Sequence, residues 1–424
     1  MQYNTTTLSN GLRIIHLPST SPVVYCGYQV AAGTRHELAG EEGLAHFCEH
    51  VTFKGTERRN ALQIINALEK LGGELNAFTN KEDTTFYAAI HRDHFSKAVN
   101  LLTDIVFHSQ YPQTEIDKEV DVICDEIESY NDSPAELIYD EFENILFEGH
   151  PLGHNILGQA EQLRTYTTED ALRFTRRHYR PDNAVFFIYG DVEFRRVVRL
   201  VEGMMGALGP MSPIRPMSPI GPIGPIGPMG PMGPISPMRP IGCQTITRQK
   251  GTHQAHVIMG CRAYDINHPR RIALYLMNNL LGGPGMNSLL NLSLRERNGL
   301  VYTVESSMVS YSDTGLWTVY FGCDPHDVNK CCRLVRHQLD RLIEKPLSRS
   351  QLATAKQQIK GQIAIACDNR ENFALDFGRS FLHNGKEKDL DRLFRQIDAV
   401  TAEEIQQVAN ELFDPEKMTT LIYR

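Results

Sequence analysis

The sequence predicts an α+β protein in which a proline-rich connector joins two similar domains. Three observations support this fold class. The chain has 424 residues, more than one ordinary domain contains. A proline stands at every third position from Pro210 to Pro240 and separates two segments of domain length. Both segments begin with strand-like patterns and continue through helices, strands and further helices in loosely the same order.

The two predicted domains span residues 1–208 and 243–424. In the first we expect strands at 6–17 and 23–31, helices near 41–51 and 61–71, a hairpin over 74–91, and helices beyond it. In the second we expect strands within 244–263, a helix near 268–281, strands within 301–324, helices to about 412 and a last strand at 418–423. The shared order suggests duplication, although little residue identity accompanies it.

Residues 209–242 form the predicted connector. Proline fixes φ at about −65° and removes a backbone donor, so the tract favours polyproline II over a packed core. We interpret it as a semi-rigid linker between the domains. The alternative is a collagen-like helix, because Gly221 begins five Gly-Pro-Ile or Gly-Pro-Met triplets. Serine and arginine replace glycine in triplets on either side, however, and only glycine fits the axis of a triple helix.

Composition argues against nucleic-acid and membrane partners. Lys and Arg number 43 against 51 Asp and Glu, a formal charge of −8, which gives no electrostatic reason to expect binding to phosphate. No apolar run reaches the roughly 18 residues that a membrane span needs. The first residues lack the basic segment, apolar core and cleavage site of a secretory signal, so we expect a cytoplasmic location.

The most informative stretch is G-L-A-H-F-C-E-H-V-T-F at residues 43–53. On a helix, His46, Glu49 and His50 project from one face, because successive residues are about 100° apart. Two imidazoles one turn apart can ligate one zinc ion, and the carboxylate beside them is placed to take a proton from a metal-activated water. The alternative is a chance match on a solvated or partly buried helix, and a third ligand would decide.

The third ligand is best sought in K-E-V-D-V-I-C-D-E-I-E at residues 118–128. The pattern is helical, and Glu119 and Glu126 are seven residues apart, so they lie on nearly the same side, beside an apolar stripe. Carboxylates beside a buried stripe are costly unless a cation or a metal pairs with them. The alternative is a buried ion pair with Arg or Lys.

H-F-C-E-H, followed by Glu126 in E-V-D-V-I-C-D-E, resembles the motif of the inverzincin metallopeptidases, the family of insulinase, pitrilysin and mitochondrial processing peptidase. The similarity continues through segments at 72–87, 151–158, 179–192, 281–290 and 294–304. It implies a small bacterial-type two-domain member with two similar α/β-sandwich domains of the processing-peptidase type. The regular proline repeat departs from the family pattern, and this departure concerns the geometry between the domains more than the chemistry.

The resemblance implies one Zn²⁺ per chain. Its ligands would be His46, His50 and Glu126, with Glu49 as the general base and Glu119 as a supporting carboxylate near the site. The donors alone would accept manganese or cobalt as well.

The resemblance also implies residues that bind substrate. The first strand of the 74–91 hairpin can pair with an extended peptide by strand addition, and Asn76 and Ala77 would lie beside the scissile bond. Arg295 and Tyr302 carry donors suited to an oxyanion or to the substrate backbone. On the residues alone, Asn76 is as easily the exposed edge of a structural strand, Arg295 a solvated helix residue and Tyr302 a core aromatic.

Family members of this size form two-chain clamshells, so the resemblance implies that Arg295 and Tyr302 act in trans. A homodimer is the simplest assembly because one chain carries both residue sets, and a heterodimer with an inactive relative is the alternative. The predicted function is a zinc-dependent endopeptidase that hydrolyses peptides or unfolded polypeptides. The alternative from another class is a non-catalytic subunit or scaffold of the same fold, whose proline tract binds partners.

Overall fold

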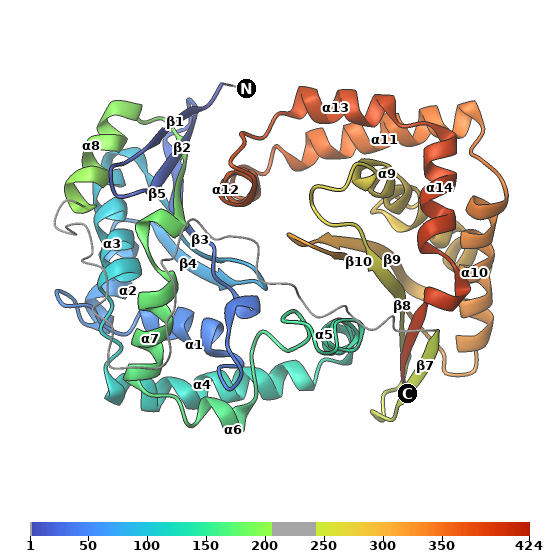
Figure 1. The fold of residues 1–424 in the computed structure, drawn as a ribbon, viewed down its shortest axis with the longest axis horizontal. Coiled ribbons are helices and arrows are strands. Elements are labelled where there is room, and N and C mark those ends of the chain that lie inside the picture. Colours follow the sequence, from blue (N-terminus) through green and yellow to red (C-terminus); the bar gives the residue numbers. More distant parts are fainter. Residues whose placement is uncertain (1, 206–242) are drawn as a thin grey trace, which may run out of the picture.

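The computed structural model describes residues 2–205 and 243–424, so the predicted connector at 209–242 lies outside the described residues. Figure 1 shows the two halves of the chain side by side, each with a β-sheet covered by helices. This arrangement confirms the predicted α+β class and the two-domain architecture. Within the described ranges, no helix combines the length and the apolar character that crossing a bilayer requires.

The first sheet has six strands in the order β1-β2-β6-β3-β5-β4. They are β1 (Asn4–Thr7), β2 (Arg13–Pro18), β3 (Val23–Val30), β4 (Glu74–Thr79), β5 (Thr84–His91) and β6 (Ala184–Gly190). The single strand expected at 6–17 is wrong, because Gly11 adopts a left-handed conformation, φ 89°, in a turn that separates β1 from β2. Strand β6 was not predicted, because its run A-V-F-F-I-Y-G lacks the alternation of a half-buried strand.

Helices cover both faces of this sheet. The helices that the first half contributes are α1 (Leu44–Thr52), α2 (Ala61–Glu69), α3 (Phe95–His108), α4 (Gln113–Asn131), α5 (Pro134–Leu146), α6 (Ala160–Leu163), α7 (Thr168–His178) and α8 (Phe194–Met205). Local sequence fixes several of their starts: Asn60 and Gln63 form a capping box at α2, and Thr167 and Asp170 form another at α7. The predicted helices near 41–51 and 61–71 correspond to α1 and α2.

The second sheet has the order β7-β11-β8-β10-β9. Its strands are β7 (Gln244–Arg248), β8 (Ala255–Ala263), β9 (Val301–Ser310), β10 (Gly315–Cys323) and β11 (Thr419–Tyr423). Its helices are α9 (Arg271–Gly282), α10 (Val328–Glu344), α11 (Arg349–Ala366), α12 (Arg370–Asn384), α13 (Leu390–Ala399) and α14 (Ala402–Leu412). In the first sheet, β6 lies parallel to β2 and antiparallel to β3; in the second sheet, β11 lies parallel to β7 and antiparallel to β8. The order β7-β11-β8-β10-β9 therefore repeats the topology of β2-β6-β3-β5-β4.

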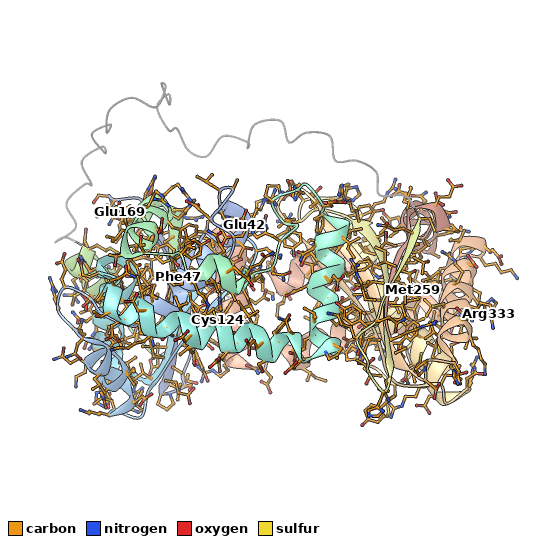
Figure 2. The ribbon with its side chains drawn as sticks, turned by 90° about the horizontal axis from the view of Figure 1, so that it is seen from below. Glu42, Phe47, Cys124, Glu169, Met259 and Arg333 are labelled. Atoms are coloured by element: carbon orange, nitrogen blue, oxygen red, sulfur yellow. The ribbon has the colours of Figure 1, made fainter. Side chains whose placement is uncertain are left out.

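The halves exchange one helix each. Helix α5 packs on the second sheet, where Ile138 and Phe142 are buried with Ile258 and Leu421. Helix α12 packs on the first sheet through residues such as Phe377, which contacts the ring of Phe187. Figure 1 shows α12 end-on beside the first sheet and α5 end-on beside the second, and Figure 2 shows α4, which carries Cys124, running toward the second half. Each half therefore completes the core of the other.

Candidate metal centre

Helix α1 positions the two histidines of H-F-C-E-H. Its N-cap is Gly43, whose φ of 87° and close approach to Gly158 leave no room for a side chain. The Glu37 carboxylate accepts hydrogen bonds from the backbone N–H groups of Ala45 (2.7 Å) and Gly43 (3.0 Å), which satisfies free donors at the helix start. The ring of His154 lies 2.8 Å from the same carboxylate.

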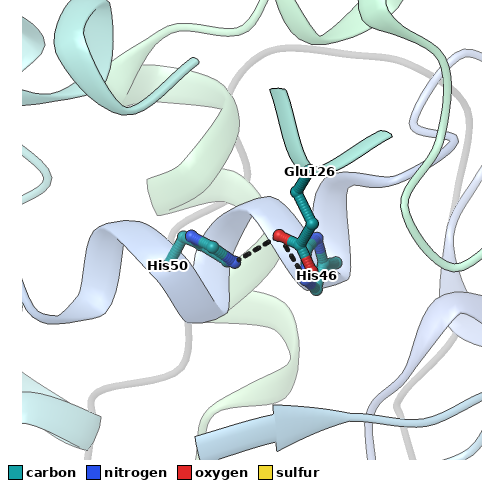
Figure 3. A group of neighbouring side chains, drawn as sticks. All are labelled: His46, His50 and Glu126. Carbon is teal, nitrogen blue, oxygen red and sulfur yellow. Dashed lines mark ion pairs between the residues drawn. The ribbon is translucent and has the colours of Figure 1, made fainter. Parts of the chain in front are cut away.

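His46, His50 and Glu126 converge between α1 and α4 (Figure 3). His50 Nε2 lies 3.3 Å from Glu126 Oε2, and His46 Nε2 lies 3.9 Å from the same oxygen. One ligand atom from each residue lies within 4.8 Å of the ligand atoms of the other two. Among the described residues, no other three or more histidine, cysteine, aspartate or glutamate side chains are grouped closely enough to hold a metal ion. The donors are two imidazole nitrogens and a carboxylate oxygen, the set typical of a catalytic zinc site.

Glu119 contacts this group through the Nδ1 side of the His50 ring. Its Oε1 lies 3.1 Å from His50 Nδ1, and its Oε2 lies 2.5 Å from Lys54 Nζ. A carboxylate that accepts the Nδ1 proton of a histidine leaves the Nε2 lone pair free toward a metal. Glu119 is buried, whereas the Glu126 side chain is 44% exposed, so burial distinguishes Glu119, but not Glu126, from an ordinary surface acid.

Glu49 lies next to the group and is nearly buried, with 8% of its surface exposed. Its Oε2 accepts a hydrogen bond of 2.9 Å from the Thr79 hydroxyl at the end of β4. Burial raises the pKa of Glu49, and His50 and Thr79 offset part of that rise. A rise in the pKa of a carboxylate makes it a stronger base.

The two histidines differ in their protonation. Burial, reinforced by the nearby charge of His50, lowers the pKa of His46 to about 4, so its ring is neutral. Burial alone would lower the pKa of His50 as well, but its hydrogen bonds to Glu119 and Glu126 raise it to about 9. His50 therefore has to release a proton before it can ligate a metal.

The predicted substrate-binding residues lie on two edge strands. Asn76 and Ala77 are on β4, which pairs with β5 on one side and forms an edge of the first sheet. Tyr302 is on β9, the corresponding edge of the second sheet, and 79% of its surface is exposed, so the alternative of a core aromatic is wrong. The Arg295 guanidinium lies 5.6 Å from the centre of that ring.

Arg295 and Tyr302 line a cavity of about 810 Å³ whose wall includes the loop from Gly282 to Met286. In the described part of the chain, the lining of this cavity includes neither the two histidines nor Glu126. The structure thus brings together the predicted metal-binding residues, Glu49 and Glu119, and it does not bring the Arg/Tyr pair to them within one cavity.

Comparison with known proteins places the chain in a family. Residues 13–160 match the model described as insulinase (peptidase family M16), and residues 165–359 match the model described as peptidase M16 inactive domain. The chain belongs to peptidase family M16. This M16 chain is 30% identical to an uncharacterized zinc protease of Bacillus subtilis over 98% of the chain and 97% of the relative. It is 32% identical to another uncharacterized zinc protease, from Streptomyces coelicolor, over 96% of the chain and 86% of that relative.

Solved structures show the M16 fold at lower identity. A protease from Helicobacter pylori superposes with a TM-score of 0.88 at 22% identity and covers 100% of this chain and 99% of the other. A peptidase M16 inactive domain from Pseudomonas fluorescens superposes with a TM-score of 0.87 at 18% identity. This match covers 100% of this chain and 98% of the other. The family predicted from the H-F-C-E-H motif is therefore confirmed.

Sequence reasoning missed two contacts of this M16 site. Glu37 caps α1, and Thr79 reaches Glu49, but neither residue stands at a helical or strand spacing from its partner. For Glu37, an acidic residue shortly before a predicted helix start was an available signal. For Thr79 we find no signal, because the contact depends on how the 74–91 hairpin packs against α1.

Proposed function

We propose that this M16 chain is a zinc-dependent endopeptidase that hydrolyses peptides or unfolded polypeptides. The observation that carries the proposal is the convergence of His46, His50 and Glu126 next to the buried carboxylate of Glu49. Relatives named as zinc proteases that match nearly the whole chain support it.

The donor set fits one zinc ion per chain. His46, His50 and Glu126 would hold it, and three protein ligands leave a fourth position for solvent or substrate. When bound there, the ion would act as a Lewis acid toward a peptide carbonyl and lower the pKa of water. Glu119 would orient His50 by accepting its Nδ1 proton, which fixes the tautomer that presents Nε2 to the metal.

Glu49 would carry the protons of the reaction. Its carboxylate would take a proton from the attacking water as general base and pass it to the leaving amine as general acid. The Thr79 hydroxyl holds one carboxylate oxygen and leaves the other free for this transfer. Burial of the side chain keeps the carboxylate out of bulk water, so its basicity is available to the reaction.

The free edge of β4 would bind the substrate as an added strand, with Asn76 and Ala77 beside the scissile bond. Strand addition recognises backbone, so it suits an enzyme that acts on varied unfolded polypeptides. Arg295 and Tyr302 would donate to the oxyanion or to the substrate backbone.

The assembly would be a homodimer in which Arg295 and Tyr302 act in trans, with a heterodimer with an inactive relative as the alternative. Among the described residues, the cavity that Arg295 and Tyr302 line includes none of the three metal-binding candidates, which supports this arrangement. The division into a zinc domain at 1–208, a connector at 209–242 and a second domain at 243–424, and the cytoplasmic location, are parts of the same proposal.

Hydrolysis of a quenched-fluorescence peptide by the wild type, Glu49→Gln and Glu128→Gln tests the proposal. Glu128 is an exposed acid on α4 and serves as the matched control. We expect Glu49→Gln to keep its zinc, measured by elemental analysis, and to lose at least about 10²-fold in kcat, while Glu128→Gln keeps both. Equal rates in wild type and Glu49→Gln at matched zinc content would instead favour the scaffold.

A further inference from the structure

Three consecutive charged residues are buried at the turn between β4 and β5. They are Lys81, Glu82 and Asp83, and the most exposed of them keeps 7% of its surface. Burying charges is costly unless each finds a partner, so a turn that buries three of them in succession requires a physical explanation. The partners of these three residues lie in different parts of the chain.

Lys81 and Glu82 fix the two sides of the turn. The Lys81 ammonium donates 3.1 Å to the Leu152 carbonyl, in the loop after α5. Glu82 pairs with Arg35 at 2.7 Å and accepts a hydrogen bond of 2.6 Å from the hydroxyl of Ser312, in the turn between β9 and β10. Glu82 therefore ties the turn to the second half of the chain.

Asp83 makes the second connection to that half. Its carboxylate is fully buried, and its Oδ2 lies 2.8 Å from Arg379 Nε and 3.0 Å from His383 Nε2. Both partners are on α12, the helix that the second half contributes to the first sheet. The other oxygen of Asp83 accepts 2.8 Å from the side chain of Asn80, and the Asp83 carbonyl accepts 2.8 Å from the Asn80 backbone N–H.

The turn leads directly to the proposed general base. Asn80 follows Thr79, the residue whose hydroxyl donates to Glu49. Gly33 packs against the same turn so closely that a Cβ would lie 2.1 Å from the Asn80 carbonyl oxygen, which holds the turn from its other side. A continuous set of contacts thus runs from α12 through Asp83 and Thr79 to Glu49.

We propose that Asp83 is a positioning residue through which α12 of the second half sets the orientation of Glu49. This inference rests on the proposed function in that it assigns a catalytic consequence to the orientation. The second half of the chain then contributes to catalysis through α12 without touching the reacting atoms. Its role is to hold the Thr79 hydroxyl where it fixes one oxygen of Glu49.

Crystal structures of two variants test the positioning itself, independently of activity. The Arg379→Gln/His383→Gln variant removes both α12 partners of Asp83. The Arg13→Gln control removes a different contact between α12 and the first sheet, the 3.1 Å hydrogen bond to the Phe381 carbonyl. We expect the turn to shift and the hydrogen bond between Thr79 and Glu49 to be lost in the double variant alone. A double variant that keeps this hydrogen bond overturns the proposal.

Kinetics test the consequence. We expect Thr79→Val to lower kcat about tenfold with little change in KM or zinc content, and Thr79→Ser, which keeps the hydroxyl, to restore most of the rate. We expect Arg379→Gln/His383→Gln to lower kcat severalfold in the wild-type background and to add nothing in the Thr79→Val background. Losses that multiply in the combined variant would show independent action and overturn the proposal.

The two readouts separate the two hypotheses. If the hydrogen bond is lost in the double variant but wild type hydrolyses peptides no faster than Glu49→Gln, the proposed peptidase function fails and the positioning stands. If wild type is an active peptidase and the double variant keeps both the hydrogen bond and its kcat, the positioning fails and the peptidase function stands.

Discussion

At the scale of single residues, Glu119 shows how one carboxylate makes two charged contacts. The sequence left open whether the acids on α4 support a metal or pair with a buried cation. At Glu119 the structure shows an ion pair with a partly exposed cation and a contact with a candidate metal ligand, because one oxygen faces Lys54 Nζ and the other faces His50 Nδ1. Burial raises the pKa of Glu119, but these two contacts lower it by more, so the net pKa lies below the ordinary value and the carboxylate is charged at neutral pH.

Replacement of Glu119 by glutamine tests its supporting role. The amide cannot supply the negative charge that orients His50, so we expect zinc affinity to fall about 10- to 100-fold. Competition with a calibrated chelator measures this loss. Glu128→Gln, the same change at an exposed position of the same helix, should leave the affinity unchanged. Equal zinc affinity in all three proteins would remove Glu119 from the site.

Residues at regular spacings were predictable and residues joined by tertiary contact were not. The face shared by His46, Glu49 and His50 follows from helical periodicity alone. Pairing with Glu126 followed from family resemblance, since its exposed side chain gives no burial signal. The contact between Thr79 and Glu49 spans 30 residues and needs the packing of β4 against α1, which no local pattern contains.

At the scale of elements, the β4–β5 turn combines an edge strand of the first sheet with an electrostatic connection between the halves. Burial alone would raise the pKa of Asp83, but His383 and Arg379 lower it by more, so the net pKa lies below that of an ordinary aspartate. The same balance holds for Asp313 of the β9–β10 turn, where Arg35 outweighs burial. Both acids therefore favour the folded state in their charged form.

Acid should weaken this connection. Because the folded pKa of Asp83 is depressed, its stabilisation is fully present above the unfolded pKa of about 4 and is lost as pH falls through the folded pKa. We expect Asp83→Asn to be less stable than wild type by about 2 kcal/mol at pH 7 in urea denaturation, and the difference to shrink as pH falls below about 4.

The control for this measurement is Asp191→Asn. Asp191 pairs with Arg92 at the surface, where both side chains are nearly half exposed, so its loss should cost less than about 1 kcal/mol at any pH. A stability difference for Asp83→Asn that stays constant from pH 7 to about pH 3 would show that its charge does not stabilise the fold.

Element types followed from sequence where the pattern was periodic or well capped. The hairpin at 74–91 and all five strands of the second sheet lie where they were expected. Strand β6 was missed because both of its faces are covered, one by the first core and the other by α12. A fully apolar run of seven residues does not distinguish a strand from a buried helix segment.

At the scale of the whole molecule, the exchange of α5 and α12 makes the two halves interdependent. Neither helix exchange was predictable, because an amphipathic pattern shows that a helix buries a face but not which sheet covers it. Without α5, the second sheet would expose Ile258, Tyr320 and Leu421; without α12, the first sheet would expose Val185 and Phe187. Exposed apolar patches of this kind favour aggregation.

The fragments 1–205 and 243–424 should therefore associate when they are produced together as separate chains. We expect a tag on either fragment to recover both in equal amounts, because the exchanged helices and the paired β4–β5 turn hold them without a covalent link. Each fragment produced alone should be largely insoluble. Two soluble fragments that do not bind each other would mean that the helix exchange contributes little to folding.

The distribution of the candidate site over one chain leads to the last prediction. Among the described residues, the cavity lined by Arg295 and Tyr302 includes none of His46, His50 and Glu126, and under the proposed arrangement in trans a second copy would complete the site. Glu49→Gln and Tyr302→Phe should each have low activity as homodimers. Differently tagged heterodimers of the two variants would contain one site with both residues intact and should recover about half of the wild-type kcat. If both residues instead acted within one chain, neither site of the heterodimer would be complete, and verified heterodimers would stay as inactive as the parent variants.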